Sequence, residues 1–108
     1  MIQVKAGVDL RGIGTEILLG VTILDAVFAA HGAKLLITSC RDSKHMEKSK
    51  HYIGDAIDIR LASRWVTTAN IDLTVLNEAR AALGDQFDLV LESDHYHLEF
   101  DPGADLTA

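Results

Sequence analysis

The chain has 108 residues, 48% of them apolar, and a formal net charge of −6 from 10 basic and 16 acidic side chains. This length fits one domain, residues 1–108, which can bury a substantial core, and the composition is that of a globular chain and not of a disordered one. A nucleic-acid binder would carry a basic face, and the sequence has none, so nucleic acid is excluded as a partner. The single cysteine excludes an intramolecular disulfide.

The sequence contains no segment with the character of a signal peptide or a transmembrane span. The N-terminus lacks the continuous apolar run of a secretory signal. The longest apolar stretch, residues 17–30, is interrupted by Thr22 and Asp25 and is too short to span a bilayer. We therefore expect a monomeric protein that is made in the cytoplasm without a signal peptide.

Apolar residues at helical spacing predict a first helix from Thr15, as its N-cap, to about His31. Gly32 then ends the helix. Its apolar stripe includes Leu18 and is widened by Leu19 and Ile23, which predicts burial on most sides.

A second helix is predicted from Asn70 or Asp72 to Leu83, with Gly84 as its stop. Its spacing predicts a core-facing stripe of leucine and alanine: Leu73, Leu76, Ala79 and Leu83.

Strands are predicted at residues 34–40, 56–61, 87–91 and 96–100, whereas the first ten residues are ambiguous. The last two segments are joined by a tight corner. Neighbouring strands near the C-terminus indicate an antiparallel sheet with helices packed on one side, which is an α+β fold.

Polar side chains alternate with apolar ones in two of these strands. In residues 56–61 the isoleucines face the core, so Asp58 points to the opposite face. In the last strand Tyr96, Leu98 and Phe100 face the core. His95 and His97 therefore share the other face. If the two polar faces meet, His51, Asp58 and His97 converge.

Two imidazoles and one carboxylate suit zinc, and three protein ligands leave a fourth position for water, as in catalytic sites. A hydrolytic site also needs a base, for which Asp94 is the candidate and Glu92 the rival. Strict alternation puts Asp94 on the wrong face, but it lies at the corner. Arg41 is a candidate to bind an anion. Spacing alone does not distinguish a metal site from two simpler interpretations. The two strand histidines can be a chance pair, and His51 and Asp58 can form a surface ion pair.

The ordered motifs resemble the zinc D-alanyl-D-alanine carboxypeptidase and L-alanyl-D-glutamate peptidase family. That family has the signature Ser-x-His-x-x-Gly-x-Ala-x-Asp, followed by an acidic residue three positions before a histidine. The first part is matched without a gap by Ser49, His51, Gly54, Ala56 and Asp58, and the second by Asp94 and His97. Upstream, residues 37–41 resemble the family's strand that ends in arginine. Cys40 departs from the small residue that is common at its position, and His95 replaces a tryptophan of some members.

The resemblance implies zinc ligands at His51, Asp58 and His97, and a catalytic base at Asp94. It implies that Arg41 orients the substrate or stabilises its oxyanion, and that His95 assists at the transition state. It further implies a hedgehog-type peptidase fold and a peptidoglycan stem peptide as substrate.

The short single-domain form looks like enzymes of tailed bacteriophages, which act on the cell wall after release or as part of a virion. Three functions stay open: a peptidase of either bond specificity, a non-catalytic zinc-stabilised module that binds peptidoglycan or protein, and a zinc amidase that cuts the sugar–peptide amide. The motif order favours the peptidase.

Overall fold

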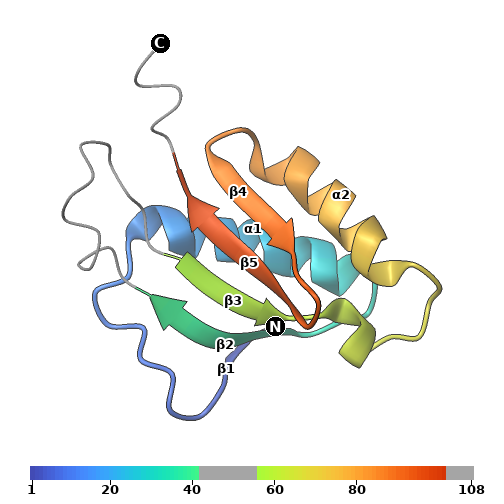
Figure 1. The fold of residues 1–108 in the computed structure, drawn as a ribbon, viewed down its shortest axis with the longest axis horizontal. Helices are drawn as coiled ribbons and strands as arrows, with labels where there is room; N and C mark the ends of the chain where they lie inside the picture. The colour runs from blue at the N-terminus through green and yellow to red at the C-terminus, as the bar shows by residue number, and fades with distance from the viewer. Residues whose placement is uncertain (42–55, 102–108) are drawn as a thin grey trace.

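The computed structural model describes residues 1–41 and 56–101 of the chain. These residues form an α+β fold with a five-stranded sheet of order β1-β2-β3-β5-β4 (Figure 1). The elements in chain order are β1 (Ile2–Val4), α1 (Thr15–Ala30), β2 (Leu35–Arg41), β3 (Ala56–Arg60), a 3-10 turn η2 (Ala62–Arg64), α2 (Ile71–Leu83), β4 (Phe87–Leu91) and β5 (His95–Phe100).

The sheet is mixed, so the prediction of an antiparallel sheet was right only for its larger part. β1 runs parallel to β2, with Ile2 opposite Leu35 and Val4 opposite Ile37. The other described neighbours are antiparallel. Parallel neighbours need a crossover connection, and α1 supplies it. With three residues, β1 is too short for an alternating pattern to reveal it in the sequence.

The first helix begins one residue earlier than predicted and is less buried. Gly14, not Thr15, occupies the N-cap, and Thr15 is the first helical residue. Leu18 and Leu19 are 44% and 57% exposed, so the prediction of burial on most sides was wrong. The buried residues form one stripe with a spacing of three to four positions, because the helix packs on one side only. They are Ile17, Gly20, Val21, Leu24 and Phe28.

The second helix has Asn70 at its N-cap and ends at Gly84, as predicted. The prediction that Leu73 faces the core was wrong, since its side chain is 52% exposed. Leu73 lies two residues from both Ile71 and Val75, which are buried, and two residues along a helix turn the side chain to the opposite side. The other three predicted core residues of this helix are buried.

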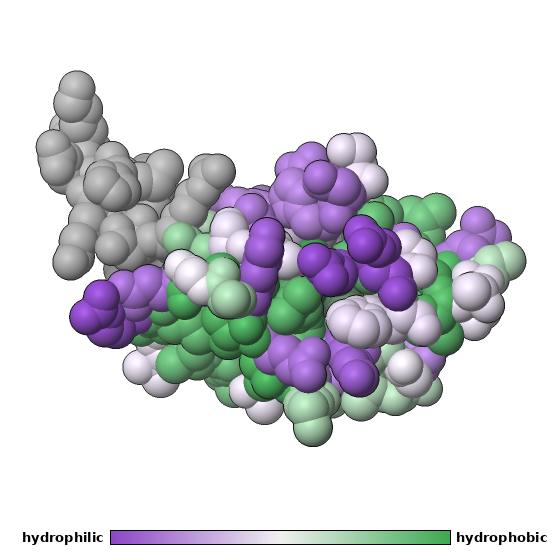
Figure 2. Space-filling view, turned by 90° about the horizontal axis from the view of Figure 1, so that it is seen from below, coloured by the Kyte–Doolittle hydropathy of each residue, from purple (hydrophilic) through white to green (hydrophobic). Residues whose placement is uncertain are grey.

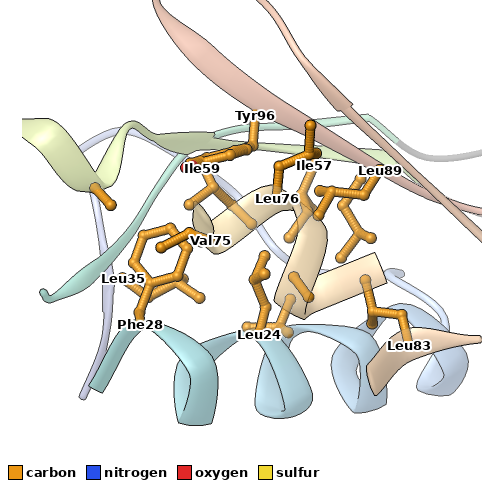
Figure 3. Close-up of a cluster of buried hydrophobic side chains, with 14 of the residues drawn as sticks. Leu24, Phe28, Leu35, Ile57, Ile59, Val75, Leu76, Leu83, Leu89 and Tyr96 are labelled. Atoms are coloured by element: carbon orange, nitrogen blue, oxygen red, sulfur yellow. The ribbon is translucent and has the colours of Figure 1, made fainter. Parts of the chain in front are cut away.

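Both helices pack on the same face of the sheet, and the apolar core lies between them and the strands (Figure 3). Tyr96 of β5 meets Phe28 of α1 edge-on, with ring centroids 5.7 Å apart. Its hydroxyl donates to the main-chain carbonyl of Asp72 at 2.8 Å. At Gly20, α1 approaches β4 so closely that an added Cβ would lie 2.6 Å from the ring of Phe87. The sheet is thus held against the helices on one face, which leaves the other face for polar side chains.

The surface of the described residues mixes apolar and charged groups. Figure 2 shows the molecule from below the view of Figure 1, with apolar areas interrupted by hydrophilic residues. At the sheet edge formed by β1, Met1, Ile2 and Val4 are exposed. Neither described helix combines the length and the apolarity that crossing a membrane requires.

Candidate metal centre

The pairing of β3 with β5 brings the predicted polar residues together. Asp58 lies directly opposite His97, and Arg60 lies opposite His95. On the other face of these two strands, Ile57, Ile59, Tyr96 and Leu98 are at most 1% exposed. The alternation predicted from the sequence is therefore confirmed, and the polar face is the one turned away from the helices.

Three side chains on this face converge on one position. The Nδ1 of His97 lies 2.8 Å from Oδ1 of Asp58, and Nε2 of His95 lies 3.5 Å from the same oxygen. One ligand atom from each residue falls within 4.8 Å of the other two. Around a tetrahedral metal with bonds of about 2.1 Å, ligand atoms stand about 3.4 Å apart. Asp58, His95 and His97 are thus close enough to hold a metal ion after small side-chain movements.

Each histidine also contacts a second carboxylate, through its outer nitrogen, which is the ring nitrogen on the side away from Asp58. Nε2 of His97 lies 2.9 Å from Oε1 of Glu99. Nδ1 of His95 lies 2.6 Å from Oδ1 of Asp94. In metal sites, such outer partners orient the ligand ring and decide which nitrogen carries the proton. Glu99 and Asp94 therefore stand where outer partners would stand if His97 and His95 held a metal.

A β-bulge places a further polar group beside Asp58. The pairing of β2 with β3 shifts between Ile37, opposite Ile59, and Ser39, opposite Asp58. In regular alternation Ser39 would share the core face of Ile37, and the extra residue Thr38 reverses that phase. As a result, the hydroxyl of Ser39 donates to Oδ2 of Asp58 at 2.8 Å.

The cluster perturbs the ionisation of its own members. Burial raises the pKa of Asp58, but hydrogen bonds from His97 and Ser39 outweigh it, and the net pKa is lowered. Burial lowers the pKa of His97, but its hydrogen bonds to Asp58 and Glu99 outweigh it, and the net pKa is raised. Ionised carboxylates only accept hydrogen bonds, so the imidazolium form of His97 satisfies both neighbours. A metal bound to His97 would have to displace one of these protons, so its binding would strengthen as the pH rises.

The remaining predicted site residues have different outcomes. His51 lies outside the described residues, as do Ser49 and Gly54 of the motif. Arg41 is the last residue of β2, and its backbone pairs with that of Ala56 at the start of β3. This places it on the strand next to Asp58, two positions beyond Ser39.

The two candidate bases lie in the turn between β4 and β5. The side chain of Asp94 is 84% exposed and reaches the cluster through His95. Glu92 is exposed, and its main-chain N–H donates to the carbonyl of His95 at 2.8 Å, which closes the turn. Asp94 thus contacts the cluster only through its neighbour in the chain, His95.

Sequence reasoning missed Ser39 as a partner of the site, because no residue in the sequence of β2 marks the bulge. A depression in the surface adjoins Ser39 and runs between β2 and the loop after β1. Its lining residues are Gly7, Val8, Asp9, Thr38, Ser39 and Cys40.

Comparisons with family models, with curated proteins and with solved structures find no match to this chain. The sequence motifs and the geometry of the cluster are therefore the basis for assigning a function.

Proposed function

We propose that this protein is a zinc peptidase that hydrolyses peptide bonds in the stem peptides of bacterial peptidoglycan. The observation that carries the proposal is the pairing of Asp58 with His97 across β3 and β5, with His95 beside them. Two imidazoles and a carboxylate are a donor set typical of catalytic zinc. Two of the metal ligands are Asp58 and His97. The third ligand is a histidine, for which the motif favours His51 and the geometry favours His95.

When bound, zinc would acidify a water molecule and polarise the scissile carbonyl. Asp94 would take a proton from the water as the water oxygen adds to the carbonyl carbon, and would then give that proton to the amine nitrogen as the C–N bond breaks. His95 lies between Asp94 and Asp58 and holds charge that develops on the carbonyl oxygen if His51 is the third ligand. Arg41, at the end of β2, binds a substrate carboxylate or that oxyanion.

The depression beside Ser39 supports this location for a peptide. It is lined by Gly7, Val8 and Asp9 on one side and by residues 38–40 of β2 on the other. Ser39 belongs to its wall and also bonds Asp58. An extended stem peptide in the depression would therefore pass close to the metal ligands. In keeping with the resemblance to enzymes of tailed bacteriophages, such a peptidase would act on the wall after release or as part of a virion.

The proposal is tested by mass spectrometry of peptidoglycan digests. Zinc-loaded protein, chelated protein and the His97→Ala variant are compared, with His31→Ala as the matched control. Nε2 of His31 lies 2.7 Å from Oε1 of Glu78 on the helical side, away from the cluster. New fragments are expected only from zinc-loaded wild type and His31→Ala, and their masses distinguish L-alanyl-D-glutamate, D-alanyl-D-alanine and sugar–peptide cleavage.

The role of Asp94 is tested by the Asp94→Ala variant. It should lose turnover while zinc still binds, with a weaker affinity if His95 is a ligand, because Asp94 contacts the outer nitrogen of His95. Full activity would move the base to Glu92. Absence of new fragments from zinc-loaded wild type would refute the peptidase. Tight binding of muropeptides without cleavage would then identify a zinc-stabilised binding module.

A further inference from the structure

We propose that Glu99 is a positioning residue that holds His97 in the tautomer whose Nδ1 faces the metal. The inference rests on the proposed metal centre and deepens it, because it assigns the coordinating nitrogen of one ligand. It concerns a residue that the peptidase motifs do not include.

The geometry around His97 distinguishes its two nitrogens. Nδ1 points to Oδ1 of Asp58 at 2.8 Å, the same oxygen that faces His95. Nε2 points away from that position, to Oε1 of Glu99 at 2.9 Å. A neutral imidazole carries one proton, and a coordinating nitrogen must be free of it. With Glu99 accepting from Nε2–H, the proton stays on the outer nitrogen and the lone pair of Nδ1 faces the metal.

The position of Glu99 in the fold makes this contact independent of loops. It follows His97 by two residues in β5, so both side chains stand on the same face of the sheet. Its side chain is 43% exposed, so the carboxylate is partly hydrated. Glu99 lies behind the ring of His97 as seen from Asp58, and it is absent from the group of residues whose ligand atoms converge. It therefore acts through His97 and is not itself a ligand.

The same organisation recurs at the neighbouring histidine. His95 directs Nε2 to Asp58 and Nδ1 to Asp94, at 3.5 and 2.6 Å. Each histidine thus has Asp58 on its inner nitrogen and another carboxylate on its outer one. In metal sites, such outer partners orient the rings of the ligating histidines.

The test compares Glu99→Ala and Glu99→Gln with Asp88→Ala. Asp88 is the matched control because it lies opposite Glu99 in β4, is exposed and carries the same charge. Zinc affinity is measured by competition with a chromophoric chelator. The tautomer of His97 in the zinc-loaded protein is read from its ¹⁵N and ring proton shifts by NMR. Thermal unfolding of the zinc-free variants confirms that each is folded.

We expect Glu99→Ala to weaken zinc binding about 10- to 100-fold, the range found for outer partners of metal ligands. Asp88→Ala should stay close to wild type. Glu99→Gln retains an acceptor oxygen, so it should keep the Nε2–H tautomer and lose less affinity than Glu99→Ala.

Two outcomes would overturn the inference. Equal zinc affinities of Glu99→Ala and Asp88→Ala, or a wild-type spectrum with His97 coordinated through Nε2, would remove the role of Glu99 and leave the metal centre standing. If wild-type protein and the His97→Ala variant are alike in failing to bind zinc, both the metal centre and the role of Glu99 are wrong.

Discussion

Replacement of Ser39 by alanine should weaken zinc binding about 10- to 100-fold without unfolding the protein. The hydroxyl of Ser39 donates to Oδ2 of Asp58 at 2.8 Å. The other oxygen of Asp58 faces the two histidines. The Ser39 hydrogen bond therefore holds the carboxylate with Oδ1 toward the metal position, and without it the carboxylate is free to rotate.

The size of the effect follows from the character of this hydrogen bond. A hydrogen bond to a charged group contributes about 1.5–3 kcal/mol. The side chain of Asp58 is 18% exposed, so water can replace the lost donor only in part. Since about 1.4 kcal/mol corresponds to a tenfold change in affinity, the loss amounts to roughly 10- to 100-fold. Because the Ser39 hydrogen bond lowers the pKa of Asp58, its removal should also raise that pKa.

The assay is chelator competition at constant pH, with Thr38→Val as the matched control. The hydroxyl of Thr38 donates to the main-chain carbonyl of Asp58 at 3.3 Å and does not contact its carboxylate. Urea unfolding in the presence of EDTA separates effects on the fold from effects on the metal. If Ser39→Ala and Thr38→Val bind zinc equally well, the argument that Ser39 orients the carboxylate is refuted.

Two further predictions concern the core behind the site and the pH dependence of the zinc-free protein. Tyr96→Phe removes the hydrogen bond to the Asp72 carbonyl. Calorimetry should show that the free energy of unfolding falls by about 1 kcal/mol and the Tm by about 4–8 °C, whereas zinc affinity should not change. A fall in zinc affinity would contradict the separation of the two faces of β5. In EDTA, the free energy of unfolding should be highest between about pH 4 and 6.5. The raised pKa of His97 contributes stability that is lost as the pH rises through that pKa. The lowered pKa of Asp58 contributes stability that is lost as the pH falls through that pKa. Urea titrations at a series of pH values from acid to alkaline check this prediction. In Asp58→Asn, the decline in the free energy of unfolding at alkaline pH should be smaller, whereas the control variant His31→Gln should keep it.

Local patterns were sufficient where one residue type decides the local conformation. Gly84 ends α2 because glycine readily adopts the positive φ of 83° found there. The faces of β3 and β5 followed from alternation, since a strand with one buried face must place every second side chain there. Helix burial was harder to predict: the apolar side chains of Leu19 and Leu73 resemble core residues, and only the direction from which the sheet packs shows that they are exposed.

The sequence by itself determined which residues of the site share a face, namely Asp58 on one strand and His95 and His97 on another. Only the tertiary structure decided that these strands are neighbours and that their register sets Asp58 opposite His97. It also decided the parallel pairing of β1 and the bulge that turns Ser39 toward Asp58. The physical reason is that alternation is a property of a single strand, whereas register and bulges depend on hydrogen bonds between segments far apart in the chain.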